Sequence, residues 1–195
     1  MGRPNVGKST LFNKLTNSRD ALVADVPGLT RDRRYGRMDV EEGQATLIDT
    51  GGLFGEHVLA NELTGQTQLA VDEADLVLLL LDGREGVTAA DEDVVTYLRK
   101  SNVAFLPVIN KIDGLNEDQI TADFVRFGFP EYAMISASHN RGLKQLRESI
   151  AEQLTALDLL EGTEWEEEAD GIRVAVVGRR ARSRCRRRSP TTSRV

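Results

Sequence analysis

Residues Gly2 to Thr10, near the start of the sequence, set the strongest limit on how this chain can fold. They read GRPNVGKST and fit the pattern G-x-x-x-x-G-K-[ST] at every fixed position. The two glycines let successive backbone N–H groups turn toward one anion, and a helix over Thr10–Leu15 would point its positive end at the same place. Lys8 adds a positive charge near the β- and γ-phosphates, and the Ser9 hydroxyl can bind Mg²⁺. The segment therefore predicts a loop that binds a nucleoside triphosphate, through Gly2, Asn5, Val6, Gly7, Lys8, Ser9 and Thr10.

Beyond this loop, apolar runs of strand length alternate with segments of helical spacing. We expect strands at 35–40, 45–48, 76–81, 103–109 and 132–135, and helices at 62–74, 91–100, 117–126 and 143–157. Leu76–Leu81 is apolar throughout, which is typical of a strand covered on both faces. The alternation predicts an α/β fold of three layers, the P-loop NTPase type, with a mostly parallel sheet and helices on both faces.

Composition is that of an ordinary soluble protein, with 40% hydrophobic and 29% charged residues among 195. No apolar run approaches the roughly 20 residues that span a bilayer, so we expect no contact with a membrane. The single cysteine, Cys185, cannot form an internal disulfide and suits the reducing cytoplasm, where we place the protein. The net charge of −6 hides a division, because residues 171–195 hold nine arginines and no acidic residue.

Two further segments predict a Mg²⁺ site. Asp49 to Gly52 forms D-x-x-G at the end of an expected strand, where Asp49 can hold Mg²⁺ through a water and the Gly52 N–H can reach the γ-phosphate. Thr30 lies in the loop between the first helix and the next strand, and its hydroxyl could complete the Mg²⁺ shell when the γ-phosphate is present. The predicted metal ligands are therefore Ser9, Thr30 and Asp49, and Thr30 and Lys8 are the candidate catalytic residues.

Asn110-Lys111-Ile112-Asp113 follows the second buried strand and predicts the choice of base. The Asp113 carboxylate can accept from both the ring N–H and the exocyclic amine of guanine. Adenine has no such donor pair and would leave a buried charge unpaired, at a cost of several kcal/mol. The Lys111 stem can lie along the base, and Asn110 can tie this loop to the phosphate loop. Ser136 and Ala137, after the next strand, can present a backbone N–H to the guanine O6.

With these motifs and the loops around them, the chain resembles the translation-factor-like GTPases, and most closely the first G domain of the Der (EngA) family. The resemblance covers about residues 2 to 157. It is carried by the phosphate loop with Leu11-Phe12-Asn13, and by Arg19–Val23, Pro27–Arg33, Ile48–Gly52, Asn110-Lys111, Asp113-Gly114 and Ser136–His139.

The resemblance implies a Mg²⁺-dependent enzyme that hydrolyses GTP to GDP and acts in assembly of the large ribosomal subunit, with rRNA and ribosomal proteins as partners. It also implies K⁺ near the phosphates, bound in part by Asn5, and we expect a monomer. Leu53 stands where Ras-type enzymes carry a water-orienting Gln, so we assign no general base and expect slow turnover. The alternatives are a non-catalytic, nucleotide-controlled binding module and an inactive gene fragment. A P-loop ATPase or nucleoside kinase is disfavoured by Asp113 and its neighbours.

We divide the chain into a G domain at 1–157, an acidic linker at 158–171, a strand remnant of a second G domain at 172–178 and a basic, disordered tail at 179–195. The remnant runs into Gly178-Arg179 as if to begin another phosphate loop, but no Gly-Lys-Ser follows. A shifted reading frame and an RNA-binding tail are both consistent with the arginines that come next.

The family has a strand before its first phosphate loop, whereas only Met1 precedes Gly2 in this sequence. Without such a strand the central sheet would expose unpaired N–H and C=O groups. The segment Ile172–Val177 has the apolar character of a buried strand. We therefore expect it to fill the central position, parallel to its neighbours, as in a circular permutant.

Overall fold

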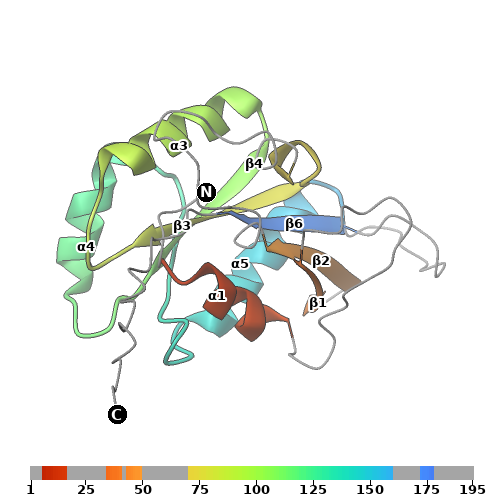
Figure 1. Cartoon of the computed structure of the whole chain (residues 1–195), viewed down its shortest axis with the longest axis horizontal. Helices are drawn as coiled ribbons and strands as arrows, with labels where there is room; N and C mark the ends of the chain where they lie inside the picture. Colours follow the sequence, from red (N-terminus) through yellow and green to blue (C-terminus); the bar gives the residue numbers. More distant parts are fainter. Residues whose placement is uncertain (1–5, 17–33, 41–42, 50–69, 160–171, 178–195) are drawn as a thin grey trace, which may run out of the picture.

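The computed structural model describes residues 6–16, 34–40, 43–49, 70–159 and 172–177 (Figure 1). Within them a six-stranded sheet has the order β1-β2-β6-β3-β4-β5. The elements in chain order are α1 (Lys8–Leu15), β1 (Arg34–Val40), β2 (Gly43–Asp49), β3 (Leu76–Asp82), α3 (Ala89–Ser101), β4 (Ala104–Asn110), α4 (Glu117–Phe124), the 3₁₀ turn η2 (Val125–Phe127), β5 (Ala133–Met134), α5 (Leu143–Ala156) and β6 (Ile172–Val177).

The last strand of the chain lies in the middle of the sheet. β6 pairs in parallel with β2, where Val174 is opposite Leu47, and in parallel with β3, where Val174 is opposite Leu76. β3, β4 and β5 continue the parallel part, and β1 pairs with β2 in the antiparallel sense. β6 is therefore in the position that the sequence analysis expected for Ile172–Val177, and it brings Val176 beside Asp49.

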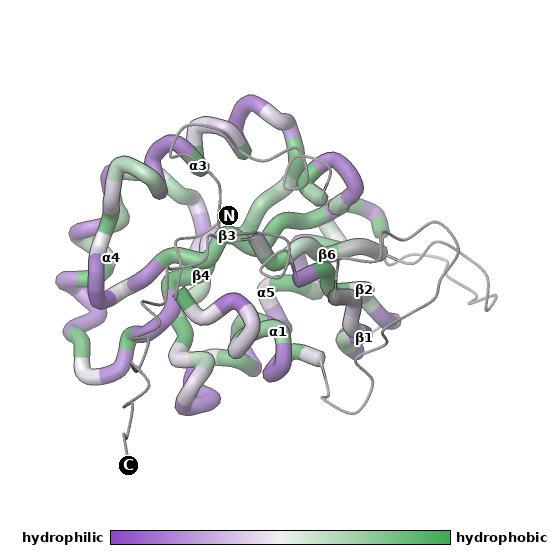
Figure 2. The backbone as a smooth tube through the Cα atoms, in the orientation of Figure 1, coloured by the Kyte–Doolittle hydropathy of each residue, from purple (hydrophilic) through white to green (hydrophobic). Residues whose placement is uncertain are grey.

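Alternate side chains of β3 build the two halves of the core. Leu76, Leu78 and Leu80 belong to one buried cluster with residues of α1 and α5, whereas Val77, Leu79 and Leu81 belong to another with residues of α3 and α4. Every residue of β3 is buried, because helices cover both faces of the strand. Figure 2 shows the resulting apolar centre, with polar segments at the outside. The three-layer α/β fold expected from the sequence is confirmed.

Helix boundaries follow local signals. Thr88 and Asp91 form a capping box at the start of α3, and the Asn116 side chain accepts from the Asp118 N–H at the start of α4. The helix expected over 117–126 ends at Phe124 and continues as η2, so that Phe124 and Phe127 are both buried in the same cluster. Gly128, at φ 58°, then stops the chain from continuing as a helix.

Two other expected elements differ in length. The strand expected over 132–135 is reduced to the two residues of β5, although the Ile135 N–H still donates to the Ile109 carbonyl. Of the helix expected over 62–74, only residues 70–74 fall within the described part of the chain, and 70–72 are helical. No helix in the described ranges combines the length and the apolar character needed to cross a bilayer.

α5 also holds the end of α1. The guanidinium of Arg147 on α5 donates from Nη2 to the carbonyls of Lys14 and Leu15, at 3.2 and 2.9 Å. These carbonyls lie in the last turn of α1, where the helix leaves acceptors without an internal partner. A cation at a helix C-terminus is also favoured by the helix dipole. Arg147 thus fixes the helix that follows the phosphate loop.

Candidate functional site

A cavity of about 260 Å³ opens at the carboxyl edge of the parallel strands, where ligands bind in open α/β sheets. It is lined by Gly7, Thr10, Arg84, Asn110, Lys111, Asp113, Ala137, Ser138 and His139. A second cavity, of about 300 Å³, lies between α3 and η2 and contains none of the predicted site residues. The first cavity therefore brings together the phosphate loop, the segment after β4 and the segment after β5, which the sequence had offered as separate motifs.

Gly7 is required at its position for two reasons. Its φ of 97° is in the left-handed region, which residues with a Cβ rarely adopt. In addition, a Cβ on Gly7 would lie 2.4 Å from Nδ2 of Asn110. The glycine therefore lets the loop turn into α1 and lets the segment after β4 approach it closely.

Asn110 joins three segments of the site. Its Nδ2 donates to the Val6 carbonyl at 2.7 Å, and its Oδ1 accepts from the Ala137 N–H at 3.0 Å. The side chain is 2% exposed, so these bonds are made away from water. The expected tie between Asn110 and the phosphate loop is present. The Ala137 N–H, however, is already engaged by Asn110, and its contact with guanine O6 stays a prediction.

Lys8 and Asp49 place opposite charges inside the protein at the other end of the site. Lys8 is 6% exposed and Asp49 is 1% exposed. Burial lowers the pKa of Lys8 to about 7, and the negative charge of Asp49 opposes that shift only in part. A buried ammonium at the start of α1 gains most from an anionic ligand, such as the phosphates that the motif predicts.

The oxygen groups near Lys8 fit Mg²⁺. Ser9 is the next residue and is exposed at the start of α1, and Asp49 ends β2 at the same edge of the sheet. A hydroxyl and a carboxylate are the hard oxygen ligands that Mg²⁺ takes, usually together with waters and substrate phosphates. The residues present therefore suit this ion.

Lys111 is held against the cavity by a residue that the sequence analysis missed. Its Nζ donates to Oδ2 of Asp82 at 2.7 Å, and Lys111 itself has the left-handed φ of 65°. Asp82 is 3% exposed, and its Oδ1 accepts from the backbone N–H groups of Arg84 and Glu85. Asp82 could have been found as the first charged residue after the apolar run of β3, since neighbouring parallel strands end at one edge.

The Asp113 carboxylate, predicted to recognise guanine, lies among donors. A hydrogen bond from Ser136 lowers the pKa of Asp113 most, and the charges of His139 and Arg84 lower it further, against the effect of desolvation. His139 Nδ1 is 2.9 Å from Oδ1, and Arg84 Nη2 is 3.9 Å from Oδ2. Neither Arg84 nor His139 was assigned to the site from the sequence.

Six of the predicted site residues line the first cavity: Gly7, Thr10, Asn110, Lys111, Asp113 and Ala137. Five others lie within the described residues but do not line it: Val6, Lys8, Ser9, Asp49 and Ser136. Gly2, Asn5, Thr30 and Gly52, which the sequence analysis also assigned to the site, lie outside the described residues. Their roles stay predictions.

Comparisons with known proteins agree with this geometry. Residues 1–111 match the model of the 50S ribosome-binding GTPase family. GTPase Der of Marinobacter nauticus is 50% identical over 183 residues, which cover 92% of this chain and 37% of that protein. GTPase Der of Thioalkalivibrio sulfidiphilus is 50% identical over 182 residues, covering 92% and 38%. The chain therefore spans less than two fifths of the length of these relatives.

A solved structure shares the fold. The crystal structure of Era in complex with MgGDPNP and nucleotides 1506–1542 of 16S ribosomal RNA has a TM-score of 0.63 at 26% identity, over 86% of this chain and 58% of that one. The resemblance to Der noted in the sequence is confirmed by the relatives. Because the family model matches more than half of the residues, and because the matched loop meets the segments after β4 and β5 at one cavity, this chain belongs to the 50S ribosome-binding GTPase family.

Proposed function

We propose that this chain binds GTP together with Mg²⁺ and hydrolyses it to GDP and phosphate. The observation that carries the proposal is the meeting of Gly7, Asn110 and Asp113 at one cavity. Gly7 belongs to the phosphate loop, and Asn110 and Asp113 belong to the segment after β4. Asn110 bonds both to the phosphate loop, at Val6, and to the segment after β5, at Ala137. The guanine would lie at the Asp113 end and the phosphates at the Lys8 end.

Lys8 would neutralise phosphate charge, which is the main means of catalysis in phosphoryl transfer. Burial prepares it for this role, because a lysine with a pKa of about 7 takes up a proton readily when an anion arrives. Ser9 and Asp49 would hold Mg²⁺, which supplies further positive charge at the phosphates, and Thr30 would complete that shell. No residue of the chain is assigned as general base, so no side chain is assigned to orient the attacking water. We therefore expect slow turnover.

The large ribosomal subunit is the proposed partner, through its rRNA and proteins. The family model carries 50S ribosome binding in its description, which supports the large subunit. The Era structure contains a segment of 16S rRNA, from the small subunit, and so supports contact with rRNA in general. We place the protein in the cytoplasm as a monomer. Asn5 would contribute to a K⁺ site beside the phosphates, by resemblance to Der and Era-like enzymes.

Steady-state release of phosphate from GTP tests this proposal. We expect slow release that requires Mg²⁺, is faster in KCl than in NaCl at matched ionic strength, and increases with purified large subunits. ATP serves as the control substrate and should not be hydrolysed. Binding of GTP without any release under these conditions would favour the non-catalytic, nucleotide-controlled module instead.

A further inference from the structure

Asp82 is a buried carboxylate to which the proposed function gives no role. It is the last residue of β3, directly opposite Asn110 at the end of β4, and it is 3% exposed. A carboxylate is seldom buried in this way unless it is paired. Its Oδ2 accepts from Nζ of Lys111 at 2.7 Å, and Lys111 lines the cavity of the predicted guanine site. The buried carboxylate therefore acts on that cavity through one lysine.

The two oxygens of Asp82 have separate partners. Oδ1 accepts from two backbone N–H groups of the turn after β3, at 3.0 and 3.3 Å. That turn is also joined to the end of β4, because the Gly83 N–H donates to the Asn110 carbonyl at 2.8 Å. Oδ2 receives the Lys111 ammonium. The carboxylate is therefore fixed by the backbone on one side, and it can fix the ammonium on the other.

Lys111 gains most from such an anchor. Its side chain is 31% exposed and has a long, flexible stem, and its backbone has the left-handed φ of 65°. A lysine without an anchor samples many rotamers, and a ligand that orders it on binding loses affinity. The bond to Asp82 fixes Nζ before a ligand arrives, so that the apolar stem can form part of the cavity wall.

We propose that Asp82 is a positioning residue for the nucleotide base, which holds the Lys111 ammonium so that the Lys111 stem packs against the flat face of the purine. This inference rests on the proposed guanine site. The contact is with the face of the base, whereas Asp113 would bind its edge. The contribution of Asp82 should therefore be equal for bases that differ only in their edge groups, and absent for a ligand that has no base.

The negative charge of Asp82 has an effect opposite to this positioning role. A carboxylate near the site repels the phosphates of any nucleotide, so its removal alone would strengthen the binding of every phosphate ligand. Loss of the anchor for Lys111 would instead weaken nucleotides and would not weaken pyrophosphate. The two effects differ in sign for a nucleotide, so one substitution can separate them.

Asp82→Asn isolates the bond to Lys111, because the amide oxygen can still accept from the turn whereas the amide nitrogen cannot accept from an ammonium. We expect this variant to weaken GDP by about three- to tenfold, which is the cost of ordering one long side chain. IDP, whose base lacks the exocyclic amine, should weaken by the same factor. Pyrophosphate should bind equally well or more tightly. Equilibrium titration of the whole chain in one Mg²⁺ buffer measures all three ligands.

Two further variants test whether Asp82 acts through Lys111. Lys111→Met removes the ammonium, so adding Asp82→Asn to it should cause no further loss of GDP affinity. The double variant leaves no buried charge of this pair without a partner, so we expect it to fold even if Asp82→Asn alone does not. It should show the same pattern, with weaker GDP and IDP and no loss of pyrophosphate.

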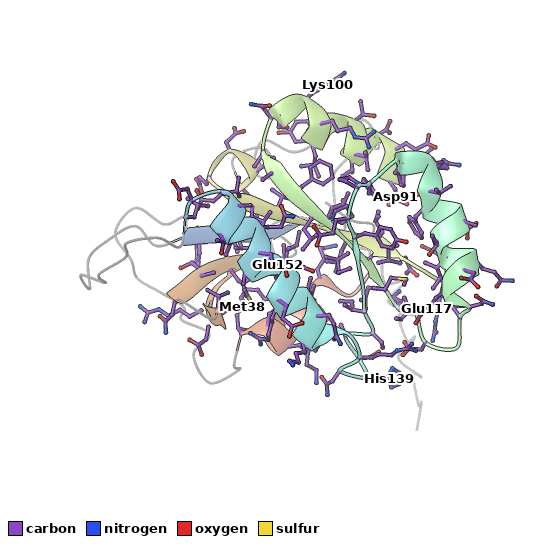
Figure 3. All side chains as sticks on the ribbon, turned by 180° about the vertical axis from the view of Figure 1, so that it is seen from behind. Met38, Asp91, Lys100, Glu117, His139 and Glu152 are labelled. Carbon is purple, nitrogen blue, oxygen red and sulfur yellow. The ribbon has the colours of Figure 1, made fainter. Side chains whose placement is uncertain are left out.

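Glu117→Gln is the matched control. It removes one carboxylate and breaks an ion pair of the same 2.7 Å length, with Arg141, and neither residue lines the cavity. Figure 3 shows Glu117 at the start of α4. This variant should bind GDP, IDP and pyrophosphate as the unaltered chain does.

A loss of pyrophosphate affinity together with that for GDP would overturn the inference by showing that the turn supports the whole site. Tighter binding of GDP to Asp82→Asn would overturn it by showing that charge alone matters, and a loss confined to GDP would place the effect at the edge of the base. If the unaltered chain binds GDP no better than ADP, the proposed function fails and this inference fails with it. A clear preference of the unaltered chain for GDP, with GDP affinity unchanged by Asp82→Asn and by the double variant, refutes the positioning role alone.

Discussion

Asn110 Nδ2 donates a 2.7 Å hydrogen bond to the Val6 carbonyl, across 104 positions of sequence. Through the same side chain, Oδ1 accepts from the Ala137 N–H. One buried amide therefore sets the spacing between the segment that would bind phosphate and the segments that would bind the base. Its donor and its acceptor are both used, so neither can be replaced without leaving a buried backbone group unpaired.

Asn110→Asp tests this arrangement with almost no change of shape. The substitution turns the donor that faces Val6 into an acceptor, and we expect the free energy of unfolding to fall by about 2–4 kcal/mol. Asn116→Asp is the matched control, because this exposed side chain caps α4 by accepting from the Asp118 N–H, which aspartate does equally well. The free energy of unfolding of both variants is measured in urea. Equal losses for Asn110→Asp and Asn116→Asp would contradict a stabilising role of the two buried Asn110 bonds.

Gly7→Ala should cost more than Gly114→Ala. Both glycines have left-handed φ values, 97° and 71°, so each substitution carries a strain of about 1 kcal/mol. A Cβ on Gly114 would meet nothing within 4 Å, whereas one on Gly7 would meet Asn110. We expect Gly7→Ala to lower stability by a further 1–3 kcal/mol, roughly, and to abolish GDP binding, as measured by thermal unfolding and titration. Equal stability of the two variants would contradict the close approach of the two segments.

The burial of Lys8 predicts a specific pH dependence. The folded pKa is about 7 and the ordinary value is 10.5, so the unfolded chain binds more protons between these values. The penalty for burying Lys8 is complete below about pH 7 and is relieved as the pH rises toward 10.5. Relative to Lys8→Met, the nucleotide-free protein should therefore gain a few kcal/mol of stability over this range, at about 1.4 kcal/mol for each pKa unit. A difference between the two proteins that stays constant with pH would contradict this environment for Lys8.

Asp113→Asn should exchange one nucleotide preference for another. The amide offers a donor where the carboxylate offers only acceptors, so GTP is expected to bind less tightly. Xanthosine triphosphate, whose carbonyl replaces the exocyclic amine, should bind more tightly to the variant than to the unaltered protein. Competition between the two nucleotides measures the change, and an unaltered preference would contradict the assignment of Asp113.

Deletion of β6 tests its place in the sheet. Val174, Ala175 and Val176 are fully buried, and the strand pairs with β2 on one side and β3 on the other. A chain without residues 172–195 should lose its cooperative unfolding transition, because both neighbours would expose unpaired backbone groups. A chain that ends at Val177 keeps β6 and is the control. Normal unfolding of the shorter chain would show that β6 is dispensable.

Periodicity and motif order were sufficient to predict most of the described fold. The uninterrupted apolar run of Leu76–Leu81 is typical of a strand covered on both faces, and it predicts a helical layer on each side. The change from α4 to η2 could not be predicted, because the packing of Phe127 and the left-handed Gly128 decide it and periodicity does not. The short β5 likewise depends on its neighbour β4.

The motifs also predicted which residues would meet, but not how they hold one another. Asn110 and Asp113 were assigned from their pattern alone. Asp82 was missed because its partner, Lys111, is distant in sequence. His139 was missed because it lies in an exposed loop, and no local pattern shows that it approaches Asp113. Such contacts depend on the spacing of loops after different strands, which local sequence does not encode.

Equilibrium titration of the whole chain with GDP and with ADP, in the presence of Mg²⁺, is the most direct test of the guanine site. A site whose carboxylate must be paired by two donors rejects a base that lacks them by a large factor. We predict that GDP binds at least about a hundredfold more tightly than ADP. Equal affinities for the two nucleotides, or no binding of either, would contradict the guanine site built from Gly7, Asn110 and Asp113.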